Sequence, residues 1–210
     1  MTELPPNVYR VAQRRFAAIS GSPWVYWVTD SLRRLFETLP KLGDVAQPRQ
    51  GLATANNFRF LRYWWEVGRA HIGFGCRDRA DAQATGKRWF PCMKGGAYRK
   101  WYGNQEYVVN WQDDGKEIKE GIVGRYPYLD GNWEWVAKNT NYYFREGVTF
   151  TDLTSGALSI RWMPLGFVFD HAGNCLFPSQ GNVWVWLSLL NSSPFSQLMH
   201  INPTIHFYIW

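Results

Sequence analysis

The first fifty residues carry their apolar side chains at the spacing of helices. Residues 8–19 place apolar positions on one side of a helix, which a Ser-Gly-Ser-Pro sequence ends. Residues 24–28 are apolar and predict a short strand or turn, and residues 32–39 predict a second helix that ends before Pro40. A polar stretch with Gly and Pro follows, which predicts a helical connecting segment over residues 1–50 and a separate domain over residues 51–210.

After residue 51 the pattern changes to short aromatic and β-branched segments separated by Gly, Pro, Asn and Asp clusters, which is typical of strands and turns. The predicted strands cover residues 58–67, 107–111, 141–144, 158–162, 167–170 and 183–190. Two further helices are expected, a short polar one over residues 112–120 and another over residues 193–200. We therefore predict an α+β fold, with a mixed, mainly antiparallel sheet of several strands and short peripheral helices.

The apolar runs and the cysteines argue against a membrane-spanning or a secreted protein. The longest strongly apolar run, residues 183–190, is shorter than the ~18 residues that a membrane span needs. The first thirty residues contain arginines but no apolar core of a secretion signal. The three cysteines are widely spaced without a Cys-x-x-Cys pair, so we expect buried thiols of a reducing compartment and a cytoplasmic protein without a membrane partner.

The net charge of +6 is concentrated in one segment. Residues 58–101 contain ten basic and three acidic residues, about +7, whereas the remainder has thirteen basic and fourteen acidic residues, about −1. Aromatic residues, among them Trp64, Trp65 and Trp89, are interleaved with these cations. Such a mixture favours contact with a phosphate backbone and stacking on bases, and the alternative of a solvated basic face over an aromatic core stays open.

The sequence predicts no catalytic residue, no metal site and no cofactor site. The His and Cys residues do not have the spacing of a zinc site, and Asp170-His171 beside Cys175 predicts a turn. Gly73-Phe74-Gly75 lacks the third glycine of a dinucleotide or S-adenosylmethionine loop. The Lys-Gly-Gly sequence at residues 94–96 resembles a phosphate-binding turn without P-loop spacing, so it predicts a tight turn with a basic tip.

Three long blocks resemble a known family in the same order. They are QGLATANNFRFLRYWWEV at residues 50–67, KRWFPCMKGGAYRKWYGNQEYVVNW at residues 87–111, and YYFREGVTF at residues 142–150 with residues 158–173. They are similar to blocks of the large adenine-specific DNA methyltransferases of BREX phage-defence systems, which are relatives of single-chain restriction–methylation enzymes. Residues 19–27 and 189–207 are similar to the same family, so the resemblance covers nearly the whole chain.

The resemblance implies a DNA-binding part of such an enzyme. In that family the S-adenosylmethionine loop and the Asn-Pro-Pro-Tyr motif for the flipped adenine lie upstream, and this sequence has neither. We therefore expect a truncated piece, with the linker over residues 1–50 and the target-recognition region over residues 51–210. It would need no cofactor, although the full-length family uses S-adenosylmethionine, and it would not be catalytic by itself.

The resemblance and the charge pattern together predict how the chain contacts double-stranded DNA. Phosphate contacts are expected from Arg59 and Arg62, and from Lys94, Arg99 and Lys100 around the Gly-Gly turn. The candidates for base edges are Asn57, Asn104 and Arg161. Core packing is favoured over DNA contact for Trp64, Trp65, Trp101 and Trp111.

Two points stay open in this interpretation. Ala55 and Asn56 stand where the family has Gly-Asp, and Ala55 would strain the turn if that position needs a positive φ. The alternative function is a protein–protein interaction module, which would dock through exposed aromatic residues onto other defence-system proteins or a phage inhibitor.

Overall fold

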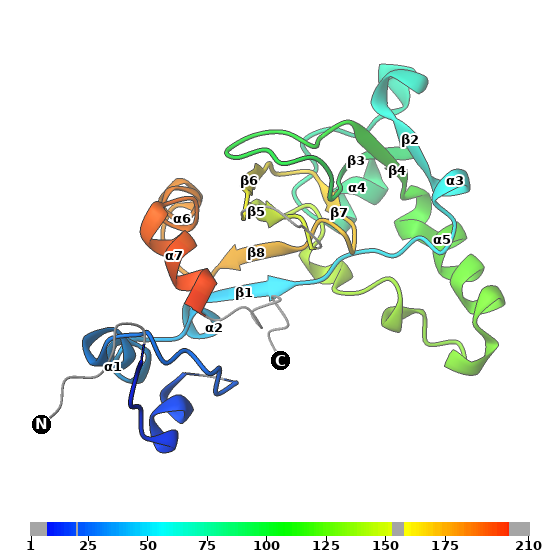
Figure 1. Ribbon diagram of the computed structural model, residues 1–210. Coiled ribbons are helices and arrows are strands. Elements are labelled where there is room, and N and C mark those ends of the chain that lie inside the picture. Colours follow the sequence, from blue (N-terminus) through cyan, green and yellow to red (C-terminus); the bar gives the residue numbers. More distant parts are fainter. Residues whose placement is uncertain (1–7, 20, 153–157, 202–210) are drawn as a thin grey trace, which may run out of the picture.

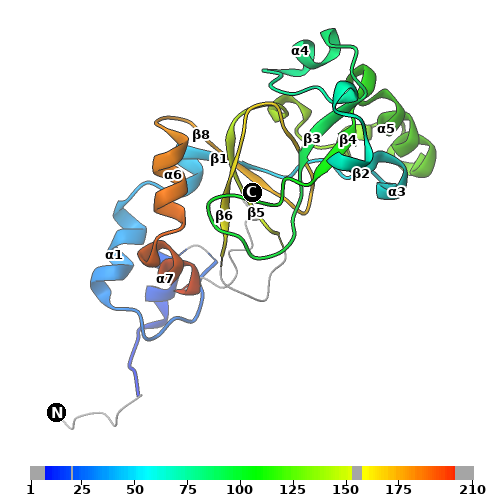
Figure 2. The same ribbon diagram turned by 90° about the horizontal axis from the view of Figure 1, so that it is seen from above.

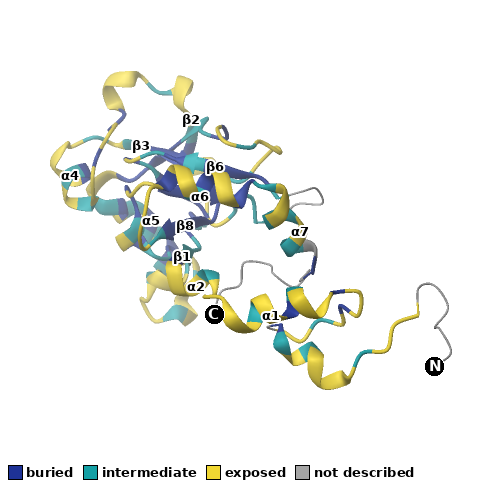
Figure 3. Cartoon of the chain, turned by 90° about the vertical axis from the view of Figure 1, so that its left-hand side faces the viewer, coloured by how far each residue is buried: buried dark blue, intermediate teal, exposed yellow. Residues whose placement is uncertain are grey.

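The computed structural model describes residues 8–19, 21–152 and 158–201. The chain forms two four-stranded sheets, with helices gathered at the two ends of the molecule (Figure 1). Buried residues lie along the strands, and exposed residues lie on the outer sides of the helices (Figure 3). No helix among the described residues combines the length and apolarity needed to cross a membrane.

The first sheet has the strand order β1-β8-β5-β6, and all its pairs are antiparallel. Its strands are β1 (Ala46–Arg49), β5 (Gly147–Phe150), β6 (Ile160–Met163) and β8 (Cys175–Pro178). Helix α6 (Val183–Leu190) covers this sheet, because its apolar residues at helical spacing pack against Val148, Ile160 and Leu176.

The second sheet has the order β2-β4-β3-β7, in which only the β3–β7 pair is parallel. Its strands are β2 (Leu61–Tyr63), β3 (Trp89–Met93), β4 (Tyr107–Asn110) and β7 (Val168–Phe169). Helices α3 (Asn57–Phe60), α4 (Arg79–Ala84) and α5 (Gln112–Arg125) surround it. The core between this sheet and α5 includes Phe90, Val109, Trp111, Ile118 and Ile122.

Short 3-10 helices connect the elements around the second sheet. They are η2 (Trp64–Glu66), η3 (Arg69–His71), η4 (Pro127–Leu129), η5 (Trp133–Trp135) and η6 (Thr140–Tyr142). Each carries three residues, so these segments follow local hydrogen bonds and turn chemistry more than a long amphipathic pattern.

The N-terminal part packs against the last described helix. It contains η1 (Gln13–Ala18), α1 (Asp30–Thr38) and α2 (Leu42–Val45). Ile19, Val25 and Val28 form a small apolar cluster with Ile201 of α7 (Ser193–Ile201), so α1 and α7 lie side by side (Figure 2). Strand β1 pairs with β8 although it precedes residue 50, and the boundary at residue 50 stays a prediction.

The predicted α+β class is confirmed, and several elements follow the predicted pattern. The helices over residues 32–39, 112–120 and 193–200 correspond to α1, α5 and α7, and three predicted strands correspond to β4, β6 and β7. Residues 8–19 contain only the 3-10 helix η1, and residues 24–28 form a turn. Residues 58–67 are divided among α3, β2 and η2, and residues 141–144 contain the end of η6.

The strand prediction for residues 183–190 is wrong, because this segment is helix α6. The eight residues are almost all apolar, so their hydrophobicity alone cannot separate a buried strand from a helix. The cap decides: the Asn182 side chain accepts a hydrogen bond from the Trp184 backbone N–H at 2.9 Å. Strands β1, β3, β5 and β8 were not predicted. Three of them contain a proline, Pro48, Pro91 or Pro178, and β5 begins with a glycine, and these residues are uncommon inside strands.

An ion-paired carboxylate holds the strained start of α5. Asp113 and Asp114 have positive φ values of 51° and 59°, a backbone conformation that residues other than glycine seldom adopt. The Asp114 carboxylate accepts hydrogen bonds from Arg79 Nε at 2.7 Å and from Lys119 Nζ at 2.6 Å. Burial alone would raise the pKa of Asp114, but the hydrogen bonds from Arg79 and Lys119 outweigh it and leave this pKa below its ordinary value.

We predict that Asp114→Asn lowers the free energy of unfolding by about 2 kcal/mol at neutral pH, because both cations lose a charged acceptor. A lowered folded-state pKa contributes stability above the unfolded pKa, and that contribution is lost as pH falls below about 4. The difference between wild type and variant should therefore shrink in acid. Chemical denaturation measures it, and the exposed neighbour Asp113→Asn is the control with a change below about 0.5 kcal/mol. Equal losses in both variants would contradict this account.

Candidate nucleic-acid interface

The Lys94 side chain lies at the junction of the two sheets. Strand β7 leads through residues 170–174 into β8, so the chain passes here from one sheet to the other. Lys94 Nζ lies 2.6 Å from Asp170 Oδ2, and the Asp170 side chain is 2% exposed. The second oxygen of Asp170 accepts hydrogen bonds from the backbone N–H groups of Ala172 (3.0 Å) and Gly173 (2.8 Å). Lys94 and Asp170 therefore fix the corner between the sheets.

The Gly-Gly segment beside Lys94 packs against this corner. A Cβ atom added to Gly95 would stand 2.2 Å from the carbonyl oxygen of Ala172, so only glycine allows the approach. The backbone N–H of Gly96 is directed at the Thr151 hydroxyl at 3.4 Å. The structure has no turn at residues 94–96, and Lys94 is directed inward to Asp170 instead of forming a basic tip, so a phosphate contact by Lys94 would compete with this ion pair.

We predict that Lys94→Met lowers the free energy of unfolding by about 3–5 kcal/mol, because it leaves the Asp170 carboxylate buried without its counter-charge. Lys116, which is largely exposed, offers the matched control, since Lys116→Met should change stability by less than about 0.5 kcal/mol. Denaturant unfolding of both variants tests this. A loss for Lys94→Met no greater than that of the control would show that the corner does not depend on this pair.

Two predicted base-contacting residues are buried. Arg161 is 0% exposed, and its guanidinium donates hydrogen bonds to the hydroxyls of Ser159 and Thr151, each at 3.2 Å. No carboxylate pairs with it among the described residues, and burial lowers the pKa of Arg161 from its ordinary value. The Asn104 side chain is also buried and donates to the carbonyl of Ala97 at 3.1 Å. We correct both assignments, because neither side chain has a surface with which to meet a base edge.

Arg99 and Lys100 lie on the loop between β3 and β4, away from the arginines of α3 and β2. Arg99 is exposed and lies 4.0 Å from Glu106. Lys100 donates a hydrogen bond to the carbonyl of Asn191 at 3.2 Å, at the end of α6. The structure therefore separates the predicted phosphate-contacting residues into two groups, and their role in DNA contact stays a prediction.

The turn at residues 54–57 positions helix α3 and its arginine. Asn56 caps α3 by accepting a hydrogen bond from the Arg59 backbone N–H at 3.1 Å. The Thr54 hydroxyl donates to the Asn57 side chain at 2.6 Å, and the Ala55 carbonyl accepts a hydrogen bond from Arg125. The turn is thus tied to α5, and it presents the exposed side chains of Asn57 and Arg59.

Ala55 has a φ of +58°, so the turn does require a positive φ where the resembled family has glycine. We predict that Ala55→Gly raises the free energy of unfolding by about 1 kcal/mol, because the left-handed conformation costs a side-chain-bearing residue about 1–2 kcal/mol. Thermal unfolding measures this change. Ala84→Gly in helix α4 is the control and should lower the free energy of unfolding by about 1 kcal/mol. If Ala55→Gly also lowers it, the backbone at Ala55 is not strained.

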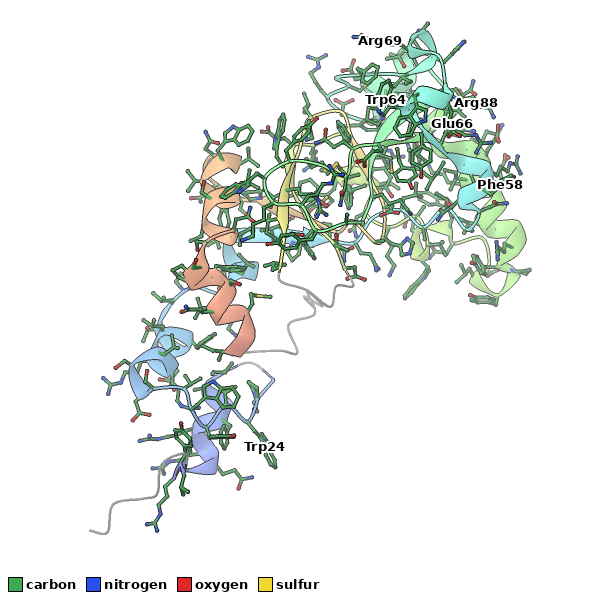
Figure 4. All side chains as sticks on the ribbon, turned by 45° about the horizontal axis from the view of Figure 1, so that its top comes forward. Trp24, Phe58, Trp64, Glu66, Arg69 and Arg88 are labelled. Atoms are coloured by element: carbon green, nitrogen blue, oxygen red, sulfur yellow. The ribbon has the colours of Figure 1, made fainter. Side chains whose placement is uncertain are left out.

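Four cations lie close to Trp89 at one end of the molecule, of which Arg69 and Arg88 are exposed and Arg62 and Lys87 are partly exposed. The guanidinium carbons of Arg62 and Arg88 lie 5.9 and 5.6 Å from the Trp89 ring centroid. Lys87 donates to the carbonyl of Ala70 in η3 at 2.7 Å, beside Arg69, and Ile72 just after η3 forms a bridge with Trp89. Arg69 and Arg88 are seen at this end with the exposed Phe58, far from Trp24 (Figure 4). We call Arg62, Arg69, Lys87 and Arg88 the Trp89 basic surface.

Few acids face the Trp89 basic surface. Among the described residues, no carboxylate lies within 4.0 Å of Arg62, Arg69 or Lys87. Arg88 shares Glu117 with Arg59, at 4.0 Å and 3.1 Å respectively. Arg62 instead donates to the backbone carbonyls of Phe58 (2.5 Å) and Leu61 (2.7 Å). This arrangement can attract a polyanion without first breaking strong ion pairs.

Arg69, Lys87 and Arg88 belong to the basic segment but were not predicted as site residues. The signal that could have found two of them is the Lys87-Arg88-Trp89 sequence, in which cations adjoin a large aromatic ring. Arg69 lies near Trp89 because Ile72 forms a β-bridge with Trp89. This pairing joins residues far apart in the sequence, so the spacing of residue types along the chain does not reveal it.

The tryptophans divide into buried and exposed groups. Trp111 is 1% exposed and packs in the main core, as predicted. The core prediction is wrong for Trp64, Trp65 and Trp101, since each is at least half exposed. These three follow turns at the end of strand β2 and in the β3–β4 loop, where the chain leaves the sheet.

The described residues contain no cluster of metal-ligating side chains. Within residues 8–19, 21–152 and 158–201, no three His, Cys, Asp or Glu side chains are grouped to hold a metal ion. The three cysteines are buried and free, as predicted, and burial raises the pKa of Cys76 and Cys92. A Cβ at Gly73 would lie 2.4 Å from the Phe90 ring, so glycine allows the chain to pack closely on Phe90 there.

Comparison with known proteins confirms the resemblance to adenine-specific methyltransferases. The chain is 36% identical over 205 residues, 96% of its length, to the adenine-specific methyltransferase PglX of Lacticaseibacillus casei (strain Zhang). It is 36% identical over 167 residues, 79% of its length, to the adenine-specific methyltransferase BrxX of Escherichia coli O9:H4 (strain HS). No family model matches the chain. It spans only 17% and 12% of these two relatives, so it corresponds to one segment of each.

Proposed function

We propose that this chain, similar to one segment of adenine-specific methyltransferases, is a DNA-binding target-recognition part of an adenine-N6-specific DNA methyltransferase of a phage-defence system and is not catalytic by itself. The observation that supports it most is the Trp89 basic surface, because its cations lie together with few facing acids. Double-stranded DNA is the proposed partner, since phosphate contacts supply most of the sequence-independent affinity.

The proposed non-catalytic role rests on the motifs. The sequence has no Asn-Pro-Pro-aromatic motif, and its single Asn-Pro pair, Asn202-Pro203, is followed by Thr204. The S-adenosylmethionine loop and adenine pocket would therefore belong to another part of a complete enzyme. In this proposal the chain holds the duplex while that part removes the adenine from the stack.

Base contacts are proposed for the segment next to the basic surface. Asn57 is exposed on α3, two residues before Arg59, and its amide can pair with a base edge. Arg59 and Arg62 would contact the DNA phosphates next to that base, since both follow the capped turn that also carries Asn57.

Duplex binding as a function of salt tests the proposed function. Contacts by Arg59, Arg62, Arg69, Lys87 and Arg88 predict a slope near −4.5 in a plot of log affinity against log salt, from about −0.9 per phosphate. Arg69→Gln combined with Arg88→Gln should reduce the slope by about 2 and weaken binding to all sequences alike. Glu117→Gln should strengthen binding, because it removes an acid that competes for Arg59 and Arg88.

The matched control removes two exposed arginines from other parts of the chain. Arg34 lies on α1 and Arg145 follows η6, and both are exposed. Arg34→Gln with Arg145→Gln changes the net charge by the same amount as the test pair, so it should leave the slope nearly unchanged if binding is local. Equal effects of the two pairs, or no salt-dependent binding by wild type, would contradict the proposal.

A second candidate function is protein docking, which the outer side of α6 favours. Trp184, Val185 and Leu189 are about half exposed or more, and Trp184 packs on Trp162 with ring centroids 4.9 Å apart. Other defence-system proteins are the proposed partners for such an apolar side. This function would depend on α6 and would not respond to the Arg69 and Arg88 substitutions.

A further inference from the structure

Three aromatic rings form a stacked ladder on the edge of the second sheet. The rings of Trp65 and Tyr63 have centroids 4.6 Å apart and planes within 5°. Tyr63 also stacks on Tyr107, at 4.8 Å and 29°. Trp64 lies edge-on to Trp65 at 5.6 Å. We call Trp65, Tyr63 and Tyr107 the aromatic ladder.

The backbone holds this ladder in place before any ligand arrives. Tyr63 and Tyr107 are register partners in strands β2 and β4, so their side chains stand next to each other on one side of the sheet. Helix η2 then turns the chain so that Trp65 returns over Tyr63. The Glu66 carboxylate fixes this turn by accepting a hydrogen bond from the Tyr63 backbone N–H at 2.6 Å, and the Trp64 N–H donates to the carbonyl of Glu106 at 2.9 Å.

The ladder is more exposed than rings that serve only to hold strands together. Tyr63 is 38% and Trp65 55% exposed, and Trp64, which contacts Trp65 edge-on, is 53% exposed. Large apolar side chains gathered on a surface are characteristic of binding sites. Cross-strand stacking accounts for Tyr63 and Tyr107, but it gives no reason for Trp64 and Trp65 to stay in water.

Both acids and cations lie near the ladder, and the acids are Glu66 of η2 and Glu106, which acts on Tyr107. Arg62, a member of the Trp89 basic surface, is the residue before Tyr63 on the edge strand β2, so cations and ladder occupy opposite sides of the same strand. Lys94 lies 5.9 Å from the Tyr107 ring. A hydrogen bond to Tyr63 and burial raise the pKa of Tyr107 to about 12, so this phenol carries no negative charge at neutral pH.

We propose that the aromatic ladder stacks on an unpaired nucleobase of DNA held by the Trp89 basic surface. Methylation of a base inside a duplex requires its removal from the stack, which leaves bases unpaired at the bound site. Stacking on exposed aromatic rings is how proteins hold such bases without regard to sequence. The inference rests on the proposed function, because it needs DNA at the basic surface, and it adds the unpaired base as a second element of recognition.

Two duplexes that differ at one position test the inference with the full 210-residue chain. One contains a single unpaired 2-aminopurine, and the other has the same base paired with thymine. Wild type should bind the unpaired duplex about tenfold more tightly, the lower end expected for one stacked base, and should quench its fluorescence. Trp65→Leu should remove both the preference and the quenching, and it should leave affinity for the paired duplex unchanged.

Matched variants separate stacking from a general loss of aromatic surface. Trp65→Phe keeps a ring in the ladder and should retain most of the preference. Trp135 is 67% exposed on η5, outside the ladder and the basic surface, so Trp135→Leu should behave as wild type. If Trp65→Leu does not fold, the wild-type preference and quenching decide the matter alone.

The possible failures are distinct. Equal wild-type affinity for both duplexes, or a preference that Trp65→Leu keeps, would overturn the base-stacking ladder while duplex binding stands. Wild type that binds neither duplex would contradict the proposed function, and the ladder inference would be overturned with it.

Discussion

The buried ion pair between Lys94 and Asp170 is the constraint on which the arrangement of the two sheets depends. Asp170 is almost fully buried, and it binds the Lys94 ammonium and two backbone N–H groups at once. A carboxylate in this position is tolerated only while all its partners are present. Because the chain passes from the second sheet to the first at Asp170, this pair sets how one sheet continues into the other.

This constraint also explains why the basic segment does not act as one surface. Some of its cations are taken up by the structure: Lys94 by Asp170, and Arg79 by Asp114. Others remain exposed, and a group of these lies around Trp89 and helix α3, while Arg99 is exposed on the loop between β3 and β4. The local excess of positive charge is therefore smaller than the sequence suggests, but it is concentrated on one end of the molecule. The proposed DNA contact and the packing thus use different cations of the same segment.

The fold class, several helices and the buried Trp111 were predictable because each depends on local periodicity or composition. Helix α6 was not predictable in the same way, since a continuous apolar run fits a strand as well as a helix. The local feature that favours the helix is the Asn182 side chain, which caps its first turn. Among the candidate residues, Arg59 and Arg62 are available at the surface, whereas Arg161 is buried between Ser159 and Thr151. The type of a side chain shows which chemistry it can perform, but only tertiary pairing decides whether it faces solvent, an acid or the core.

In the proposed complex, DNA docks on the Trp89 basic surface beside α3 and β2. Hydrogen–deuterium exchange of the chain with and without a DNA duplex tests it most directly, because it reports which backbone segments become protected. We expect protection in residues 56–74 and 86–90, with little change in α1, α6 and α7. Protection confined to residues 183–201, or no protection at a DNA concentration that saturates binding, would contradict it.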